Sequence, residues 1–153
     1  MKTPILPRIV AILALLCALP GLAQDKGYWR AASKTASSIT GDIEISGTKL
    51  TINFTGFLIA QARTLAPAEV SAAFDADVNS GATGILYHLV VPASKRFLHH
   101  NTLCGTEDTQ WMATYVSGNT LQVAFFSGSA APVFTIDVLG LSTDLCGTYT
   151  YVR

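Results

Sequence analysis

Two cysteines occupy the same local sequence, Leu-Cys-Gly-Thr, in a chain that otherwise offers little reactive chemistry. Cys104 lies in NTLCGTEDT and Cys146 in TDLCGTYTY. A zinc site would need close spacing such as C-x₂-C, and a thioredoxin-like redox site would need C-x-x-C, but neither spacing is present. An even pair in a chain that is exported, as argued below, favours a disulfide. The bridge would close a loop of about 43 residues, worth about 4 kcal/mol in the chain-entropy model.

Three histidines, His88, His99 and His100, are the next candidates for chemistry. Imidazoles bind Zn²⁺ or Cu²⁺, so a metal-dependent enzyme built on them is one alternative. Adjacent residues of a strand point to opposite faces, which argues against His99 and His100 holding one ion together. His88 lies in an apolar run, which is typical of a half-buried structural histidine. The sequence has no G-x-S-x-G or H-E-x-x-H, so we assign no catalytic residue and expect no cofactor and no enzyme activity.

The segment DADVNSG places Asp75, Asp77 and Asn79 at positions one, three and five of a possible calcium loop. Oxygen ligands at that spacing suit Ca²⁺. However, Ser80 stands at the sixth position, where an EF-hand has Gly, and Leu86 stands at the twelfth, where it has Glu. An irregular calcium loop is therefore one interpretation, and a solvated polar turn is the other.

Residues 1–23 have the pattern of a secretory signal peptide. Lys2 and Arg8 precede an apolar run too short to span a bilayer, and small residues up to Ala23 suit cleavage there. We therefore expect an exported bacterial protein, periplasmic or extracellular, with one domain over residues 24–153. Without Lys2 and Arg8, eight basic residues face ten acidic ones. No basic patch remains to attract nucleic acid, and no second apolar run predicts membrane insertion after cleavage.

The elements that must position these residues are predicted to be β-strands. Alternating apolar residues predict a strand over 27–33, a hairpin over 41–57 and a second hairpin over 109–128. The more continuously apolar run over 57–63 predicts a more buried strand. Residues 67–77 fit a helix opened by Pro67 or a strand, and we prefer the strand, paired with 85–91. Further strands are expected over 132–138 and 147–152. About eight to ten short strands predict an all-β domain, either a small antiparallel barrel or a sandwich.

Two resemblances extend this interpretation. Gly27-x-Trp29 on the first strand and Arg153 at the end are similar to lipocalin-type calycin barrels, in which an arginine covers an early tryptophan. That resemblance implies barrel closure by Gly27, Trp29 and Arg153. The segments WRAASKTASSITGDI, LYHLVVPASKRFLHHNTLCG, VAFFSG and CGTYTYVR together resemble a family of small exported bacterial proteins of unknown function. This second resemblance implies export and one compact domain, and it assigns no role to any residue.

The predicted barrel and its cationic segment indicate two possible functions, neither of which is catalytic. In the first, the barrel holds a small apolar or amphipathic ligand. Its candidate wall residues are Trp29, Phe74, Tyr87, Trp111 and Phe125. In the second, the protein inhibits an extracellular or periplasmic hydrolase through the most cationic segment, residues 93–101. The candidate contact residues there are Lys95, Arg96, Phe97, His99 and His100.

Overall fold

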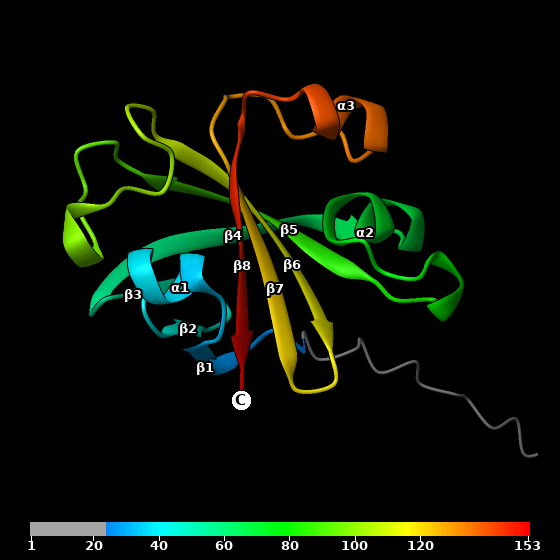
Figure 1. Cartoon of the computed structure of the whole chain (residues 1–153), viewed down its shortest axis with the longest axis horizontal. Helices are drawn as coiled ribbons and strands as arrows, with labels where there is room; N and C mark the ends of the chain where they lie inside the picture. The colour runs from blue at the N-terminus through cyan, green and yellow to red at the C-terminus, as the bar shows by residue number, and fades with distance from the viewer. Residues whose placement is uncertain (1–23) are drawn as a thin grey trace, which may run out of the picture.

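The computed structural model describes residues 24–153, so the expected signal peptide lies outside the described residues. Within them, eight antiparallel strands close into a barrel in simple chain order (Figure 1). The all-β prediction is confirmed, the barrel is the form adopted, and its eight strands are the lower end of the expected range of eight to ten. The strands are β1 Gly27–Ala31, β2 Ile43–Ile45, β3 Lys49–Ile52, β4 Thr55–Leu65, β5 Gly84–Val91, β6 Thr109–Ser117, β7 Thr120–Phe126 and β8 Leu145–Val152.

The first and last strands close the barrel. Arg30 pairs with Val152 and Ala31 with Tyr151, while the other side of β1 pairs with β2. Because successive strands are antiparallel, the connections alternate between two ends of the barrel. We call the end where β1 begins and β8 ends the terminal end. We call the opposite end, which carries the connections β1–β2, β3–β4, β5–β6 and β7–β8, the disulfide end.

The strand preferred for residues 67–77 is wrong, because this segment forms helix α2, Pro67–Phe74. Proline suits the first helical position, where its missing N–H is not needed. The Glu69 carboxylate accepts a hydrogen bond from the Ala66 N–H at 2.9 Å and thereby caps the helix start. Val70 and Phe74 are buried one turn apart, so the apolar pattern is also that of a helix against the barrel wall.

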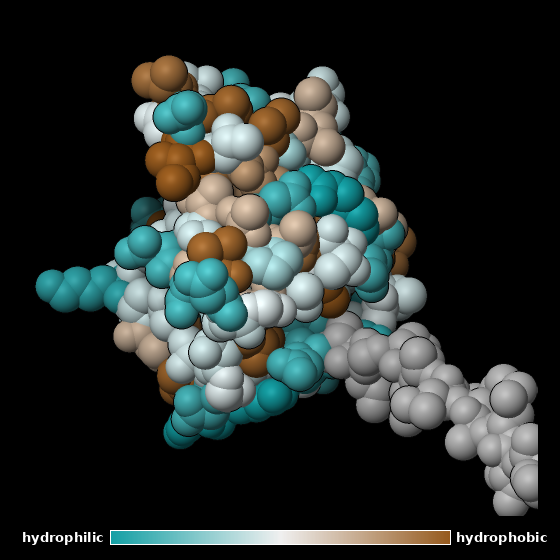
Figure 2. Space-filling model, turned by 90° about the vertical axis from the view of Figure 1, so that its right-hand side faces the viewer, coloured by the Kyte–Doolittle hydropathy of each residue, from teal (hydrophilic) through white to brown (hydrophobic). Residues whose placement is uncertain are grey.

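The strand expected over 132–138 is also wrong. This part of the β7–β8 connection is irregular up to helix α3, Ile136–Leu141, which Thr135 caps by accepting from the Val138 N–H. Phe134 is buried, but Ile136 and Leu141 are exposed, and hydrophobic side chains gather over α3 at the top of the face in Figure 2. The other helical segments are α1 Lys34–Ile39, η1 Val78–Ser80 and η2 Leu98–His100. Across residues 24–153, no helix is long and apolar enough to cross a membrane.

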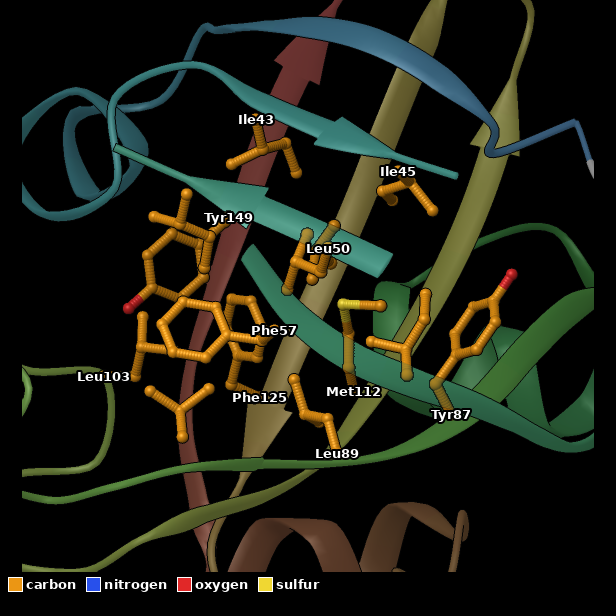
Figure 3. Close-up of a cluster of buried hydrophobic side chains, with 14 of the residues drawn as sticks. Ile43, Ile45, Leu50, Phe57, Tyr87, Leu89, Leu103, Met112, Phe125 and Tyr149 are labelled. Carbon is orange, nitrogen blue, oxygen red and sulfur yellow. The ribbon is translucent and has the colours of Figure 1, made fainter. Parts of the chain in front are cut away.

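Two hydrophobic cores lie on opposite sides of the barrel wall. Inside, side chains from all eight strands pack against one another, and the rings of Phe125 and Tyr149 meet edge to face at 5.2 Å (Figure 3). Outside, α2 and α3 cover part of the wall, where Ala113 pairs with Ala124. These two small side chains leave room for larger ones from the helices. Strands β5–β7 are therefore buried on both faces over part of their length.

Candidate ligand-binding site

The terminal end of the barrel is closed by Trp29 and Arg153, in the arrangement that the resemblance to calycin barrels implies. The Arg153 guanidinium lies 4.4 Å from the centroid of the fully buried Trp29 ring. Arg153 also reaches the Lys26 carbonyl at 3.4 Å, and its own N–H donates to the Asn119 carbonyl at 3.0 Å. A stacked guanidinium both shields an indole face and attracts it electrostatically. This contact joins the two ends of the described chain.

Trp29 also holds the segment that precedes β1. Its indole Nε1–H donates to the Asp25 carbonyl at 2.7 Å. This contact turns the chain inward, so that Asp25 is only 2% exposed. An acidic residue is thereby placed inside the end of an otherwise apolar barrel.

The Asp25 carboxylate is only half satisfied. Its Oδ2 accepts hydrogen bonds from the Tyr87 hydroxyl at 2.8 Å and from the Thr114 hydroxyl at 2.7 Å. Its Oδ1 is buried and, among the described residues, has no hydrogen-bond partner. Figure 3 shows the Tyr87 hydroxyl pointing away from the interior cluster. Buried polar atoms are nearly always paired, so an unpaired carboxylate oxygen calls for an explanation.

The Tyr87 hydroxyl that donates to Asp25 stays neutral, and the nearby arginine side chains are engaged by other groups. Burial, together with the neighbouring Asp25 carboxylate, raises the pKa of Tyr87, which stays a neutral donor at physiological pH. Arg63 is engaged by Glu69 through two contacts of 2.8 Å, and this partner lowers the pKa of the Glu69 carboxyl. Arg153 is stacked on Trp29. Over residues 24–153, no cationic side chain forms an ion pair with Asp25.

Asp25 forms part of the wall of a pocket of about 450 Å³ at the terminal end. The pocket lies between the N-terminal segment, the end of β4, the loop that leads into β5 and the end of β6. Gly84 begins β5 at this point, and a Cβ there would collide with the Thr114 carbonyl oxygen, so glycine allows the strands to approach closely. The lining residues are mainly polar: Gln24, Asp25, Gln61, Thr64, Gly81, Ala82, Thr83, Gly84, Ile85, Thr114, Tyr115 and Val116.

The five candidate wall residues do not surround one cavity. Trp29, Tyr87 and Phe125 belong to the core inside the barrel, whereas Phe74 and Trp111 pack on the outer side of the wall. Sequence reasoning missed Asp25 and Thr114. The available signal was Thr114 itself, a polar residue at an inward position between Met112 and Val116 on a strand expected to be apolar.

The cationic segment 93–101 is divided between surface and core. Phe97 is buried and its ring lies 6.0 Å from that of Phe57, so it does not contact solvent as expected. The Lys95 side chain is held against the start of β4, because its Nζ donates to the Thr55 hydroxyl at 2.9 Å. The Arg96 guanidinium donates to the Ala93 carbonyl at 2.7 Å. His99 and His100 are exposed in η2, and both have positive φ, 54° and 61°.

The metal alternatives place their residues apart or use them in turns. His88 is an exposed residue of β5, not half-buried as expected, with its ring edge-on to Trp111 at 4.9 Å, whereas His99 and His100 lie in η2. Asp75 ends α2 with φ 54°, and Asp77 caps η1 by accepting from the Asn79 N–H at 2.9 Å. Within the described part of the chain, no group of three or more His, Cys, Asp or Glu side chains is arranged to hold a metal ion.

The predicted disulfide is confirmed. Cys104, in the β5–β6 connection, is bonded to Cys146 at the start of β8. The Thr109 hydroxyl lies 3.2 Å from the Cys104 sulfur. The bond therefore ties the β5–β6 connection to the last strand. No family model, no curated protein and no solved structure matches the chain.

Proposed function

We propose that this chain is an exported, non-enzymatic binding protein that holds a small amphipathic ligand in the terminal pocket. The pocket volume of about 450 Å³ lies within the range of about 300–1,000 Å³ that is usual for small-molecule sites. The observation that carries the proposal is the pocket wall that Asp25 shares with several other polar side chains, in which one carboxylate oxygen, Oδ1, is buried and has no partner among the described residues. The barrel interior, by contrast, is filled by side chains that pack against one another.

The test is to fill the pocket from its rim. Thr83 is exposed and lines the pocket, so Thr83→Trp should block it without disturbing the core. Thr106→Trp, at an exposed position of the β5–β6 connection, is the matched control. Small-molecule fragments titrated into isotope-labelled protein should shift the amide signals of residues 81–85 and 114–116, and T83W should abolish these shifts while T106W keeps them. Shifts confined to other regions, or unaffected by T83W, would contradict the proposal.

A second function, inhibition of an extracytoplasmic hydrolase, is favoured by one feature of the disulfide end. Asn53 and Phe54 form the β3–β4 turn with φ of 45° and 63°, and the Phe54 side chain is 100% exposed. His99 and His100 have the same unusual backbone, and Lys95 joins their loop to this turn through Thr55. Bulky residues in the left-handed region are strained, and such strain is concentrated at recognition sites.

This second proposal predicts that Phe54 enters the cleft of the hydrolase. Phe54→Ala should weaken inhibition of the target at least tenfold, as expected for a central aromatic anchor. Leu58→Ala, at another exposed apolar position, is the control and should leave inhibition unchanged. The measurement is residual activity in a panel of serine proteases, metalloproteases and muramidases. If none is inhibited by the wild-type protein at micromolar concentration, the inhibitor proposal fails.

A further inference from the structure

We propose that cleavage of the signal peptide completes the terminal end of the barrel, because the new α-ammonium group of Gln24 forms an ion pair with the buried Asp25 carboxylate. This pairing requires the expected cleavage after Ala23 and does not depend on ligand binding. Asp25 is only 2% exposed. Its Oδ2 accepts from two neutral hydroxyls, those of Tyr87 and Thr114, whereas Oδ1 has no partner among the described residues. A buried carboxylate needs an opposite charge as well as hydrogen bonds.

The cationic side chains around the terminal end do not supply this charge. Two arginines are engaged by other groups, Arg63 by an ion pair and Arg153 by stacking on an indole ring. Lys26 follows Asp25 directly in sequence, but its Nζ lies near Gly47, at the β2–β3 turn. Within residues 24–153, no cationic side chain forms an ion pair with Asp25. The main-chain nitrogen that cleavage would expose is the cation that remains.

Covalent geometry keeps this nitrogen beside Asp25. Consecutive Cα atoms are about 3.8 Å apart and an N–Cα bond is about 1.5 Å long, so the Gln24 nitrogen lies within about 5.3 Å of the Asp25 Cα atom. Before cleavage it is a neutral amide nitrogen joined to Ala23. After cleavage it is an α-amino group, which is largely protonated at pH 7 because its ordinary pKa is about 7.7–8.0. Gln24 is exposed and lines the terminal pocket, so N–H groups that do not reach Asp25 can stay hydrated.

Export then supplies the last stabilising interaction at both ends of the barrel. The Cys104–Cys146 bond forms in an oxidising compartment, and the ion pair at Asp25 forms when the signal peptide is removed. The precursor lacks both interactions, so its folded state is less stable than that of the mature chain until export is complete.

The test is an NMR titration of the mature protein, purified after export from the full-length gene. Intact mass and N-terminal sequencing first establish that the chain begins at Gln24 and has not cyclised. In cyclisation the α-amine attacks its own side-chain amide, a lactam forms, ammonia leaves and the positive charge is lost. The pKa of the α-amino group is then read from the Gln24 Cα signal. We expect a value about one to three pH units above the ordinary one, because a nearby carboxylate favours the charged form.

Matched substitutions assign this shift to Asp25. Asp25→Asn should return the α-amino pKa to its ordinary value, and Asp137→Asn, at an exposed acid on α3, should leave it raised. The other ionisable groups around the N-terminus are the same in all three proteins, so they cannot cause a difference between them: Lys26, Arg63, Glu69, Tyr87, Tyr115 and Arg153. An α-amino pKa that is equal in wild type and D25N would overturn the inference.

An insertion keeps the test decisive if D25N does not fold. One threonine placed between Ala23 and Gln24 leaves Asp25 and its two hydroxyl donors intact, but moves the charge away by up to about 3.6 Å. It should bring the α-amino pKa to its ordinary value and lower the thermal midpoint by about 3 °C or more. An insertion protein with the stability and α-amino pKa of the wild type would overturn the inference, as would a mature chain that begins elsewhere or has lost ammonia. Fragment binding in the pocket is a separate measurement, so the proposed function stands or falls independently.

Discussion

The two ends of the barrel are closed by different kinds of interaction. At the disulfide end, a covalent bond between Cys104 and Cys146 and the buried side chains of Phe97 and Leu103 close the barrel. At the terminal end, closure depends on the stacking of Arg153 on Trp29 and on hydrogen bonds. Each end buries polar atoms without a hydrogen-bond partner among the described residues: Trp111 Nε1 and Ser127 Oγ towards the disulfide end, and Asp25 Oδ1 at the terminal end. The two ends therefore differ in the kind of group that is buried, since over residues 24–153 only the terminal end buries a carboxylate.

The largest effect is expected from removing the covalent closure. The double substitution Cys104→Ser with Cys146→Ser should lower the free energy of unfolding by about 4 kcal/mol, because the unfolded chain regains the freedom of a long loop. Urea denaturation of the variant and the wild type measures it. Alkylation of the denatured, unreduced wild type should give no labelled thiol in the mature chain. A loss below about 1 kcal/mol would show that the disulfide end is held mainly by packing.

Alkaline pH should act on the interior between the two ends. Burial raises the pKa of Tyr149 to about 12, whereas an unfolded tyrosine titrates near pH 10. The neutral form is thus favoured in the folded state, so this stabilisation is complete below pH 10 and is lost as the pH rises towards 12. Tyr149 alone should contribute a loss of about 1.4 kcal/mol per pH unit, or about 3 kcal/mol in all. Burial also raises the pKa values of Tyr87 and Tyr151, which should add to this loss.

Urea denaturation at pH 9, 10 and 11, with absorbance at 295 nm, measures this loss. Tyr149→Phe should reduce the slope, since its ring cannot ionise. A wild-type unfolding free energy that stays constant from pH 9 to 11 would contradict the prediction.

Removing one donor from Asp25 tests the hydrogen-bonded end. Tyr87→Phe should lower the free energy of unfolding by about 1–3 kcal/mol, because a buried carboxylate oxygen loses one of its two partners. Tyr149→Phe is the matched control at neutral pH, since Tyr149 is also buried but lies outside the Asp25 network. Equal effects of the two substitutions in thermal and urea unfolding would mean that the network does not stabilise the terminal end.

The smallest effect is expected at the stacked guanidinium. Arg153→Ala should lower the free energy of unfolding by about 1 kcal/mol, the size of a partly exposed cation–π contact. It should also expose one face of the Trp29 ring and shift its fluorescence to longer wavelength. Arg153→Lys keeps the charge but loses the planar stack, and should be intermediate. A fluorescence spectrum unchanged in R153A would show that Arg153 does not cover Trp29 in solution.

Local patterns predicted the parts of the fold that local physics controls. The β2–β3 hairpin and the β6–β7 hairpin follow from strict alternation around a glycine-containing turn. The helix at Pro67–Phe74 was mistaken for a strand because its apolar residues also alternate, and small alanines fit the period of a strand or of a helix. Glu69 favours the helix, because it caps the helix start and pairs with Arg63 from a neighbouring strand. A contact between two elements is not visible in the period of one of them.

The pocket shows the same limit more strongly. Asp25 is 62 residues from Tyr87 and 89 residues from Thr114 along the chain, and no motif joins the three. Their meeting requires β5 and β6 to be neighbours and Trp29 to hold the segment before β1. The sequence alone could therefore present Asp25 only as one more acid near a strand.

The amino-acid sequence by itself determined the all-β class and the disulfide, since alternation is local and only two cysteines follow residue 23. The tertiary structure alone decided which polar group is buried, which cations are already paired, and where space is left. Burial and pairing are properties of side chains brought together from distant strands, and their free energies depend on that assembled environment.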